Sequence, residues 1–230
     1  MPDPAGTIET ATPIETATPT ETATPTAAAA IGVARILFGA CVIAVLGYGY
    51  LEGLSHGRSN PFDYFGYFTN LTSLLTSAIL IASGSSTLRG RSPGTVLVSA
   101  RAASITGMIV VAVIYNGLVP GTASAPPWVS AILHAVLPFA AVLDWMLVGD
   151  RPRLPWRRIW IVLPYPVLWL TVVLVRGATD GWVPYGFLLP ERGLPLLAAT
   201  VAGLLATLLV AAAGVWAGSR LRGVRGALRR

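Results

Sequence analysis

Two residues in separate apolar runs could form a nucleophile–base pair. Thr69 lies in the run 64–82, and His134 lies in the run 128–148. A threonine hydroxyl is a weak nucleophile on its own, but a neutral imidazole within hydrogen-bond reach can take its proton as it attacks an ester carbonyl. The alcohol would leave, and water would then hydrolyse the acyl-threonine. These residue types therefore favour ester hydrolysis, provided that the fold brings the two side chains together.

Both residues also have structural explanations. Thr69 shares one helical face with three further hydroxyl residues, namely Thr72, Ser73 and Thr76. Hydroxyls on such a face can bond to carbonyls one turn earlier or hold neighbouring helices together. An ionisable residue at membrane depth is costly and is by default a functional hypothesis, but a neutral, hydrogen-bonded His134 can be structural. Both interpretations stay open on these residues alone.

The composition indicates that these residues lie inside a membrane protein. Of the 230 residues, 54% are hydrophobic and 11% are charged, and the mean hydropathy is +0.67. Soluble domains usually carry about 25% charged residues. The single cysteine, Cys41, excludes a disulfide within the chain, and one cysteine with two histidines argues against a protein-built zinc site. Thr/His chemistry requires no metal or organic cofactor.

Six apolar stretches predict an all-α, polytopic membrane protein with six transmembrane helices. The stretches cover residues 29–51, 64–82, 102–119, 128–148, 159–175 and 194–217. Each is close to the ~20 residues that an α-helix needs to cross the hydrocarbon core. The fifth stretch contains Pro164 and Pro166, which predict a kinked or tilted helix.

The chain divides into a polar tail, a membrane domain and a basic tail. Residues 1–29 hold the repeats IETATP, IETATP and TETATP, which offer no apolar face and predict disorder. This segment carries acids and no arginine, unlike the basic start of a signal peptide. Residues 30–218 are predicted to form the six-helix domain, and residues 219–230 a basic cytoplasmic tail.

Arginine placement predicts the orientation. All sixteen basic residues are arginines, and six spans place thirteen on the side of both termini and three (Arg58, Arg176 and Arg192) on the other. By the positive-inside rule, both termini are cytoplasmic and the protein lies in a plasma membrane. Because most arginines flank apolar runs, the net charge of +6 indicates topology and not nucleic-acid binding. Asp144, close to the arginines of 151–158, is expected to form a structural ion pair or cap.

The predicted topology puts the candidate site residues at one depth. With a rise of 1.5 Å per residue, Thr69 and His134 lie roughly 8 and 9 Å below the outer membrane boundary. Asn116 and Arg176 fall in the same outer layer. We expect Asn116 or Asn70 to stabilise an oxyanion, and Arg176 to bind a substrate carboxylate near the outer headgroups.

Two short motifs resemble those of a known family. They are YFTNLT (67–72) and HAVLPF (134–139), the second followed by Asp144. With the six-span layout, they are similar to the androgen-induced/FAR-17a-like family of integral membrane proteins, in its bacterial Pr6Pr-type branch. The stretch 163–188 is similar to that branch as well, and the resemblance extends over residues 30–215. All-arginine usage is also typical of a GC-rich bacterial genome.

The resemblance implies a function for the two motifs. In the animal members of the family, a threonine and a histidine in such motifs are the catalytic pair of an intramembrane hydrolase, which cleaves fatty acid esters of hydroxy fatty acids. The matching positions here are Thr69 and His134, followed by Pro138. Beyond Thr69 the segment reads Asn70-Leu71-Thr72, which departs from the animal pattern. The resemblance therefore supports the fold and the catalytic pair more strongly than it supports the same substrate.

Three hypotheses remain open from the sequence. The first is a threonine-dependent hydrolase of lipid esters, whose partners are membrane lipids. The second is a non-catalytic carrier or lipid-binding membrane protein, in which Thr69, His134 and Arg176 line a cavity without chemistry. The third is a structural subunit of a larger complex. Contact between the Thr69 and His134 side chains is the feature that the first hypothesis requires.

Overall fold

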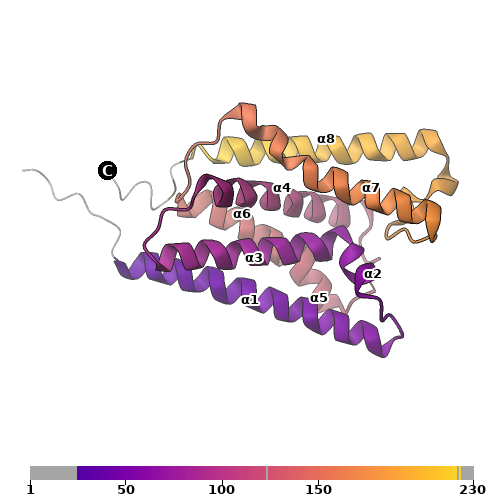
Figure 1. Cartoon of the computed structure of the whole chain (residues 1–230), viewed down its shortest axis with the longest axis horizontal. Coiled ribbons are helices and arrows are strands. Elements are labelled where there is room, and N and C mark those ends of the chain that lie inside the picture. The colour runs from indigo at the N-terminus through magenta and orange to yellow at the C-terminus, as the bar shows by residue number, and fades with distance from the viewer. Residues whose placement is uncertain (1–24, 123, 222, 224–230) are drawn as a thin grey trace, which may run out of the picture.

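The chain forms a bundle of long helices. The computed structural model describes residues 25–122, 124–221 and 223, which are in helices and loops, with no strand among them. Six helical segments are long and apolar enough to cross a membrane. In Figure 1 these segments run roughly along the long axis of the molecule. The prediction of an all-α membrane protein with six transmembrane helices is confirmed.

The first three spans are uninterrupted α-helices. They are α1 (Pro25–Ser55), α3 (Phe68–Leu88) and α4 (Thr95–Leu118). A short helix, α2 (Pro61–Gly66), precedes α3. The side chain of Asn60 accepts a hydrogen bond from the backbone N–H of Phe62 and so caps α2.

The other three spans contain or follow irregular turns. The fourth span consists of α5 (Pro127–Ala131), the π-helical turn η1 (Ile132–Val136) and α6 (Leu137–Val148). The fifth span consists of η2 (Trp156–Val162) and α7 (Pro164–Thr179). The sixth span is α8 (Leu194–Gly218). The 3₁₀ helix η2 gives way to α7 at Pro164, where the two prolines predicted an irregularity. Two 3₁₀ turns, η3 (Gly186–Leu188) and η4 (Pro190–Arg192), lie between α7 and α8.

The start of the first helix differs from the domain boundary that the sequence predicted. α1 already begins at Pro25, before the predicted boundary at residue 29, because the alanines of 27–30 are strong helix formers. The predicted disorder of residues 1–24 lies outside the described residues. So does most of the predicted basic tail, of which 219–221 and 223 are described.

Small residues let α1 and α3 pack closely along most of their length. A Cβ atom on Gly84 would overlap the carbonyl oxygen of Gly32, and one on Gly39 would lie 2.7 Å from the carbonyl oxygen of Ser77. Close approach of backbones through small residues is the usual means of helix association in lipid, where apolar burial alone favours no particular partner. The α1–α3 pair is the most extensive helix contact in the bundle.

We expect Gly84→Ala to loosen this pair. The added methyl group has no space against α1, so the free energy of unfolding should fall by about 1–3 kcal/mol. Gly47→Ala is the matched control, because Gly47 is exposed on α1 and a Cβ there meets nothing within 4 Å. Thermal unfolding of the detergent-solubilised variants measures both, and equal midpoints for the two would contradict this description of the interface.

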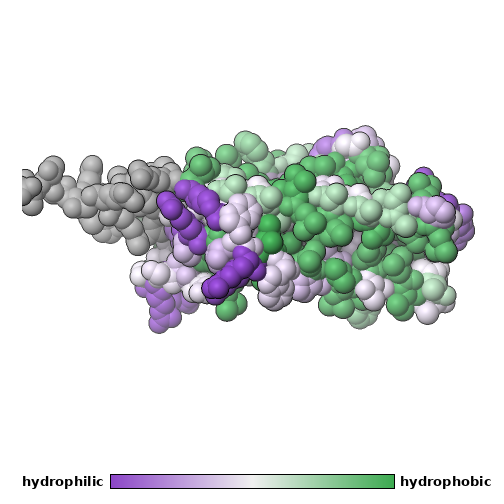
Figure 2. All heavy atoms as spheres, turned by 90° about the horizontal axis from the view of Figure 1, so that it is seen from above, coloured by the Kyte–Doolittle hydropathy of each residue, from purple (hydrophilic) through white to green (hydrophobic). Residues whose placement is uncertain are grey.

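The core is centred on α4, and the fifth span, which contains α7, is the least embedded of the six. α4 packs against α3 on one side and α8 on the other. Of the side chains of α7, only Val173 is buried. Figure 2 shows apolar residues over most of one face of the molecule, with hydrophilic residues gathered near its two ends. This distribution is typical of a helix bundle whose middle contacts lipid.

A ring of four charges, two buried arginines and two partly buried aspartates, joins the helices at one end. Arg35 of α1 donates to Asp144 of α6 at 2.7 Å and to Asp150 at 2.6 Å. Arg101 of α4 donates to the same two carboxylates, at 2.7 Å and 2.9 Å. Arg35 and Arg101 are 4% and 1% exposed. We call these four residues the ion-pair ring; it confirms the expectation that Asp144 forms a structural ion pair.

The ring holds Asp150 in its ionised form. Burial alone would raise the pKa of this carboxyl, but hydrogen bonds and charge attraction from Arg35 and Arg101 hold the pKa well below its usual range. Asp150 therefore stays charged opposite two guanidinium groups. Such a ring is stable only while all its members are present, because removal of one leaves an unpaired buried charge.

We expect Asp144→Ala to destabilise the protein strongly. The substitution leaves Arg35 and Arg101 with one shared carboxylate, which should cost about 3–5 kcal/mol of unfolding free energy. Glu191→Ala removes an acid from an exposed position and serves as the control. Thermal unfolding in detergent checks both variants, and a midpoint for Asp144→Ala equal to that of the control would contradict the role of the ring.

Candidate functional site

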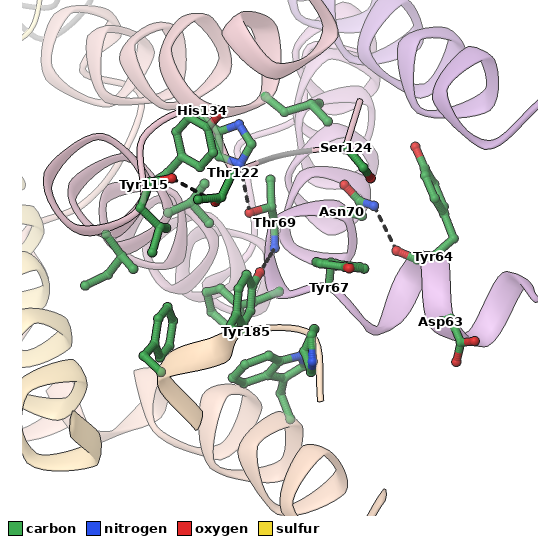
Figure 3. Close-up of a pocket in the computed structure, with 18 of the residues that line it drawn as sticks. Asp63, Tyr64, Tyr67, Thr69, Asn70, Tyr115, Thr122, Ser124, His134 and Tyr185 are labelled. Carbon is green, nitrogen blue, oxygen red and sulfur yellow. Dashed lines mark hydrogen bonds between the residues drawn. The ribbon is translucent and has the colours of Figure 1, made fainter. Parts of the chain in front are cut away.

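The end of the bundle opposite the ion-pair ring contains a large cavity. Its volume is about 1200 Å³. It is walled by α1, α2, α3, α4, α5, η1, α7 and α8, together with the loops before α2, between α4 and α5, and after α7. The mouth is lined by polar residues, among them Ser59, Asn60 and Arg192, whereas the wall formed by α8 is apolar. Figure 3 shows the polar side chains that gather in it.

Thr69 and His134 meet inside this cavity. The Thr69 hydroxyl oxygen and the His134 Nε2 atom are 3.3 Å apart, within hydrogen-bond distance. Thr69 lies in the first turn of α3 and His134 in the π-helical turn η1. Both are largely buried, at 7% and 8% exposure, yet both line the cavity. The contact that the hydrolase hypothesis requires is therefore present.

The backbone carbonyl of Ser130 sets the tautomer of His134. The Nδ1 atom lies 2.9 Å from that carbonyl oxygen, which can only accept a hydrogen bond. Nδ1 of the neutral ring therefore carries the proton, and the Nε2 lone pair faces the Thr69 hydroxyl. The imidazole is thus oriented to take a proton from Thr69, and the Ser130 carbonyl occupies the place that an aspartate has in Ser–His–Asp triads.

Tyr115 of α4 fixes the plane of the imidazole. Its ring stacks on that of His134, with centroids 3.5 Å apart and an interplanar angle of 16°. The Ser130 hydroxyl donates to the Tyr115 hydroxyl at 2.8 Å and lies 3.2 Å from Nδ1 of His134. Sequence reasoning missed both Tyr115 and Ser130. A signal was available for Ser130, which precedes His134 by one helical turn.

Tyr185 reaches Thr69 from the loop that follows α7. The backbone N–H of Thr69 donates to the Tyr185 hydroxyl over 3.5 Å. The ring of Tyr185 packs edge-on against Tyr67 and stacks on Phe187. Burial raises the pKa of Tyr185 to about 12, so the phenol keeps its proton. Sequence analysis did not select this residue, because nothing local links a tyrosine at 185 to a threonine at 69.

Asn70 is the one predicted substrate-binding residue that lines the cavity. Its side-chain amide donates to the carbonyl of Tyr64 at 2.8 Å. The other hydroxyls on the helix face of Thr69 lie deeper in the bundle: Thr72, Ser73 and Thr76 are fully buried and do not line the cavity. Thr72 bonds to the Tyr165 hydroxyl at 2.7 Å, which is a structural role.

The structure places Asn116 and Arg176 away from the cavity lining, contrary to expectation. The Asn116 amide donates to the carbonyls of Ala112 and His134, so it supports the π-helical turn and is turned away from any oxyanion near Thr69. Arg176 forms ion pairs with Asp63 and Asp180, each at 2.8 Å. With two carboxylates already on it, its guanidinium is neutralised. The sequence placed Asn116 and Arg176 at the same predicted depth as Thr69 and His134, but the two side chains bind other partners.

The described residues hold no cluster of three or more His, Cys, Asp or Glu side chains that could bind a metal ion. The donors around Thr69 are hydroxyls, one imidazole and backbone groups. Such a set is suited to hydrogen bonding and proton transfer.

Fold and cavity together define a multi-pass α-helical membrane protein with a buried Thr–His pair. Comparisons of the chain with protein-family models, with curated proteins and with solved structures find no match. The resemblance to the androgen-induced/FAR-17a-like family therefore stays a prediction that depends on the two motifs.

Proposed function

We propose that this protein is an intramembrane hydrolase of lipid esters, in which Thr69 is the nucleophile and His134 the general base and acid. The observation that carries the proposal is the 3.3 Å contact between the Thr69 hydroxyl and Nε2 of His134 in a cavity. The tautomer set by the Ser130 carbonyl supports it, because Nε2 is then the proton acceptor. The family resemblance points to the same pair.

Acylation uses the two residues together. Nε2 of His134 takes the hydroxyl proton as the Thr69 oxygen attacks the ester carbonyl carbon, and the carbonyl π electrons move to oxygen. The tetrahedral intermediate then collapses, the bond to the alkoxy oxygen breaks, and the imidazolium gives its proton to the leaving alcohol. An acyl-threonine remains.

Deacylation repeats the step with water in place of the hydroxyl. His134 takes a proton from the water as it attacks the acyl-threonine, and returns a proton to Thr69 as the carboxylic acid leaves. The chain's own residues supply the nucleophile and the base, so this mechanism calls for no cofactor.

The cavity favours an amphiphilic substrate. Its volume of about 1200 Å³ exceeds the roughly 300–1,000 Å³ of most small-molecule pockets. The α8 wall is apolar (Val201, Leu204, Leu205 and Leu208), whereas the mouth carries Asn60 and Arg192. A lipid ester could place its hydrocarbon chain along α8 and its polar end in the mouth. The same volume favours the alternative of a non-catalytic lipid carrier.

Variants of the pair separate an enzyme from a carrier. We expect Thr69→Ala and His134→Ala each to lower lipid-ester hydrolysis by about 10⁴-fold, and the double variant to lose little more, because the members of a catalytic unit are strongly non-additive. Thr69→Ser should retain part of the activity, since a hydroxyl remains. Turnover of para-nitrophenyl decanoate and labelling by a fluorophosphonate lipid probe measure these effects.

Thr76→Ala is the matched control for this test. Thr76 lies two turns further along the same helix face, is buried, and does not line the cavity. Its loss should leave hydrolysis unchanged. Hydrolysis that persists in His134→Ala, or a wild-type protein that binds lipid esters without cleaving them, would instead favour the carrier.

We further propose that the protein lies in the plasma membrane of a bacterial cell with both termini cytoplasmic. The positive-inside rule supports this orientation through the thirteen-to-three distribution of arginines. Arg58 and Arg192, from the arginine-poor side, line the cavity mouth. In this orientation the cavity opens toward the outer leaflet.

A reporter fused to the C-terminus tests the orientation. We expect a cytoplasmically active reporter, such as a fluorescent protein, to work there, and alkaline phosphatase, which needs the periplasm, to be inactive. The same two reporters fused within the loop between α7 and α8 should give the opposite pattern. Phosphatase activity at the C-terminus would overturn the proposed topology.

A further inference from the structure

The Thr–His pair lacks an identified group to stabilise the negative charge that forms on the substrate oxygen. In acyl transfer, hydrogen-bond donors aimed at that oxygen make a large contribution to the rate, and the loss of one donor lowers kcat by about 10²–10³-fold. Asn116 does not line the cavity, and the Asn70 amide donates to the carbonyl of Tyr64. The Ser130 hydroxyl donates to Tyr115. Each of these three side chains is therefore engaged, wholly or in part, with another protein group, and a donor that contacts Thr69 directly is an exception.

That exception is the hydroxyl of Tyr185. It accepts the backbone N–H of Thr69 at 3.5 Å, which uses a lone pair and leaves its own proton to donate. Among the residues that the structure describes, no hydrogen bond within 3.5 Å takes this proton, and the phenol also interacts with the Thr69 side chain. The Tyr185 oxygen and the Thr69 hydroxyl lie close together on the cavity wall, so a carbonyl group over Thr69 comes within reach of the phenol.

We propose that Tyr185 is a catalytic residue that donates its hydroxyl hydrogen bond to the oxyanion of the tetrahedral intermediate. This role rests on the proposed hydrolysis. When the Thr69 oxygen attacks, the carbonyl π electrons move onto the substrate oxygen, and the Tyr185 O–H shortens its hydrogen bond to that oxygen. The phenol keeps its proton throughout, and the electrons return to re-form the carbonyl as the alcohol leaves.

Two further features suit Tyr185 to this role. The backbone N–H of Thr69 lies in the first turn of α3, where amide protons have no acceptor within the helix, so it can donate to the Tyr185 oxygen and hold that hydroxyl beside Thr69. The Tyr185 ring is held between Tyr67 and Phe187, which orients the hydroxyl without help from substrate. A donor that is already oriented costs no reorganisation during the reaction.

Tyr185→Phe tests this role, because it removes the hydroxyl and keeps the ring that packs on its neighbours. We expect kcat for para-nitrophenyl decanoate to fall by about 10²–10³-fold with KM little changed, as for the loss of one oxyanion donor. Tyr48→Phe is the matched control: Tyr48 is a half-exposed tyrosine of α1 that packs on Trp128 and does not line the cavity. It should behave as wild type.

A pair of inhibitors distinguishes chemistry from packing. Decyl trifluoromethyl ketone adds to the nucleophile and forms a tetrahedral oxyanion, whereas a decyl aryl ether of the same length has no carbonyl. We expect Tyr185→Phe to weaken inhibition by the ketone by a factor comparable to the loss in kcat, and to leave binding of the ether and thermal stability unchanged.

The outcomes bear on the two proposals separately. Wild-type kcat and ketone inhibition in Tyr185→Phe, with Thr69→Ala inactive, would overturn the role of Tyr185 and leave the hydrolase intact. Loss of ether binding or of thermal stability in Tyr185→Phe would assign the tyrosine to packing and also overturn its role. Full activity in Thr69→Ala would overturn the hydrolase itself.

Discussion

The bundle depends on one electrostatic constraint: charges near the membrane core must be paired within the protein. Arg35, Arg101, Asp144 and Asp150 meet this constraint by sharing two guanidinium groups between two carboxylates. Because the partners come from α1, α4, α6 and the residues just after α6, the ring ties these segments together at one end. An unpaired charge there would be strongly destabilising, so the helices have little freedom to shift relative to one another at that end.

The opposite end of the bundle contains a cavity and lacks such a ring of ion pairs among the described residues. There the helices diverge around the cavity, and α7 contributes a single buried side chain. The ion-paired end and the end with the cavity are joined by α1, α3 and α4, which run continuously between them. α3 packs on both α1 and α4, and glycines allow the close contact between α1 and α3. Thr69 and His134 therefore occupy positions defined by helices that are anchored at the far end, as a pair that must keep hydrogen-bond distance requires.

Local irregularity in the fourth span places the imidazole. His134 lies in the π-helical turn η1, and π-turns within α-helices frequently occur at functional sites. Asn116 donates to the carbonyl of His134, and the carbonyl of Ser130 accepts from its ring. Together with the stacked Tyr115, these contacts leave one ring nitrogen free to face Thr69. Asn116, one of the two residues expected to stabilise an oxyanion, thus supports the backbone that carries His134.

The sequence by itself determined the six spans, the place of Thr69 and His134 within them and the structural character of Asp144. These features follow from local properties, since the length of an apolar run and the cost of a polar group in lipid do not depend on neighbouring helices. Only the tertiary structure decided which side chains meet. Matching depth could not tell that Arg176 turns to Asp63 and Asp180, or that Tyr185 reaches Thr69, because depth leaves the rotation of each helix and the path of each loop undetermined, and those are set by packing between segments far apart in the chain.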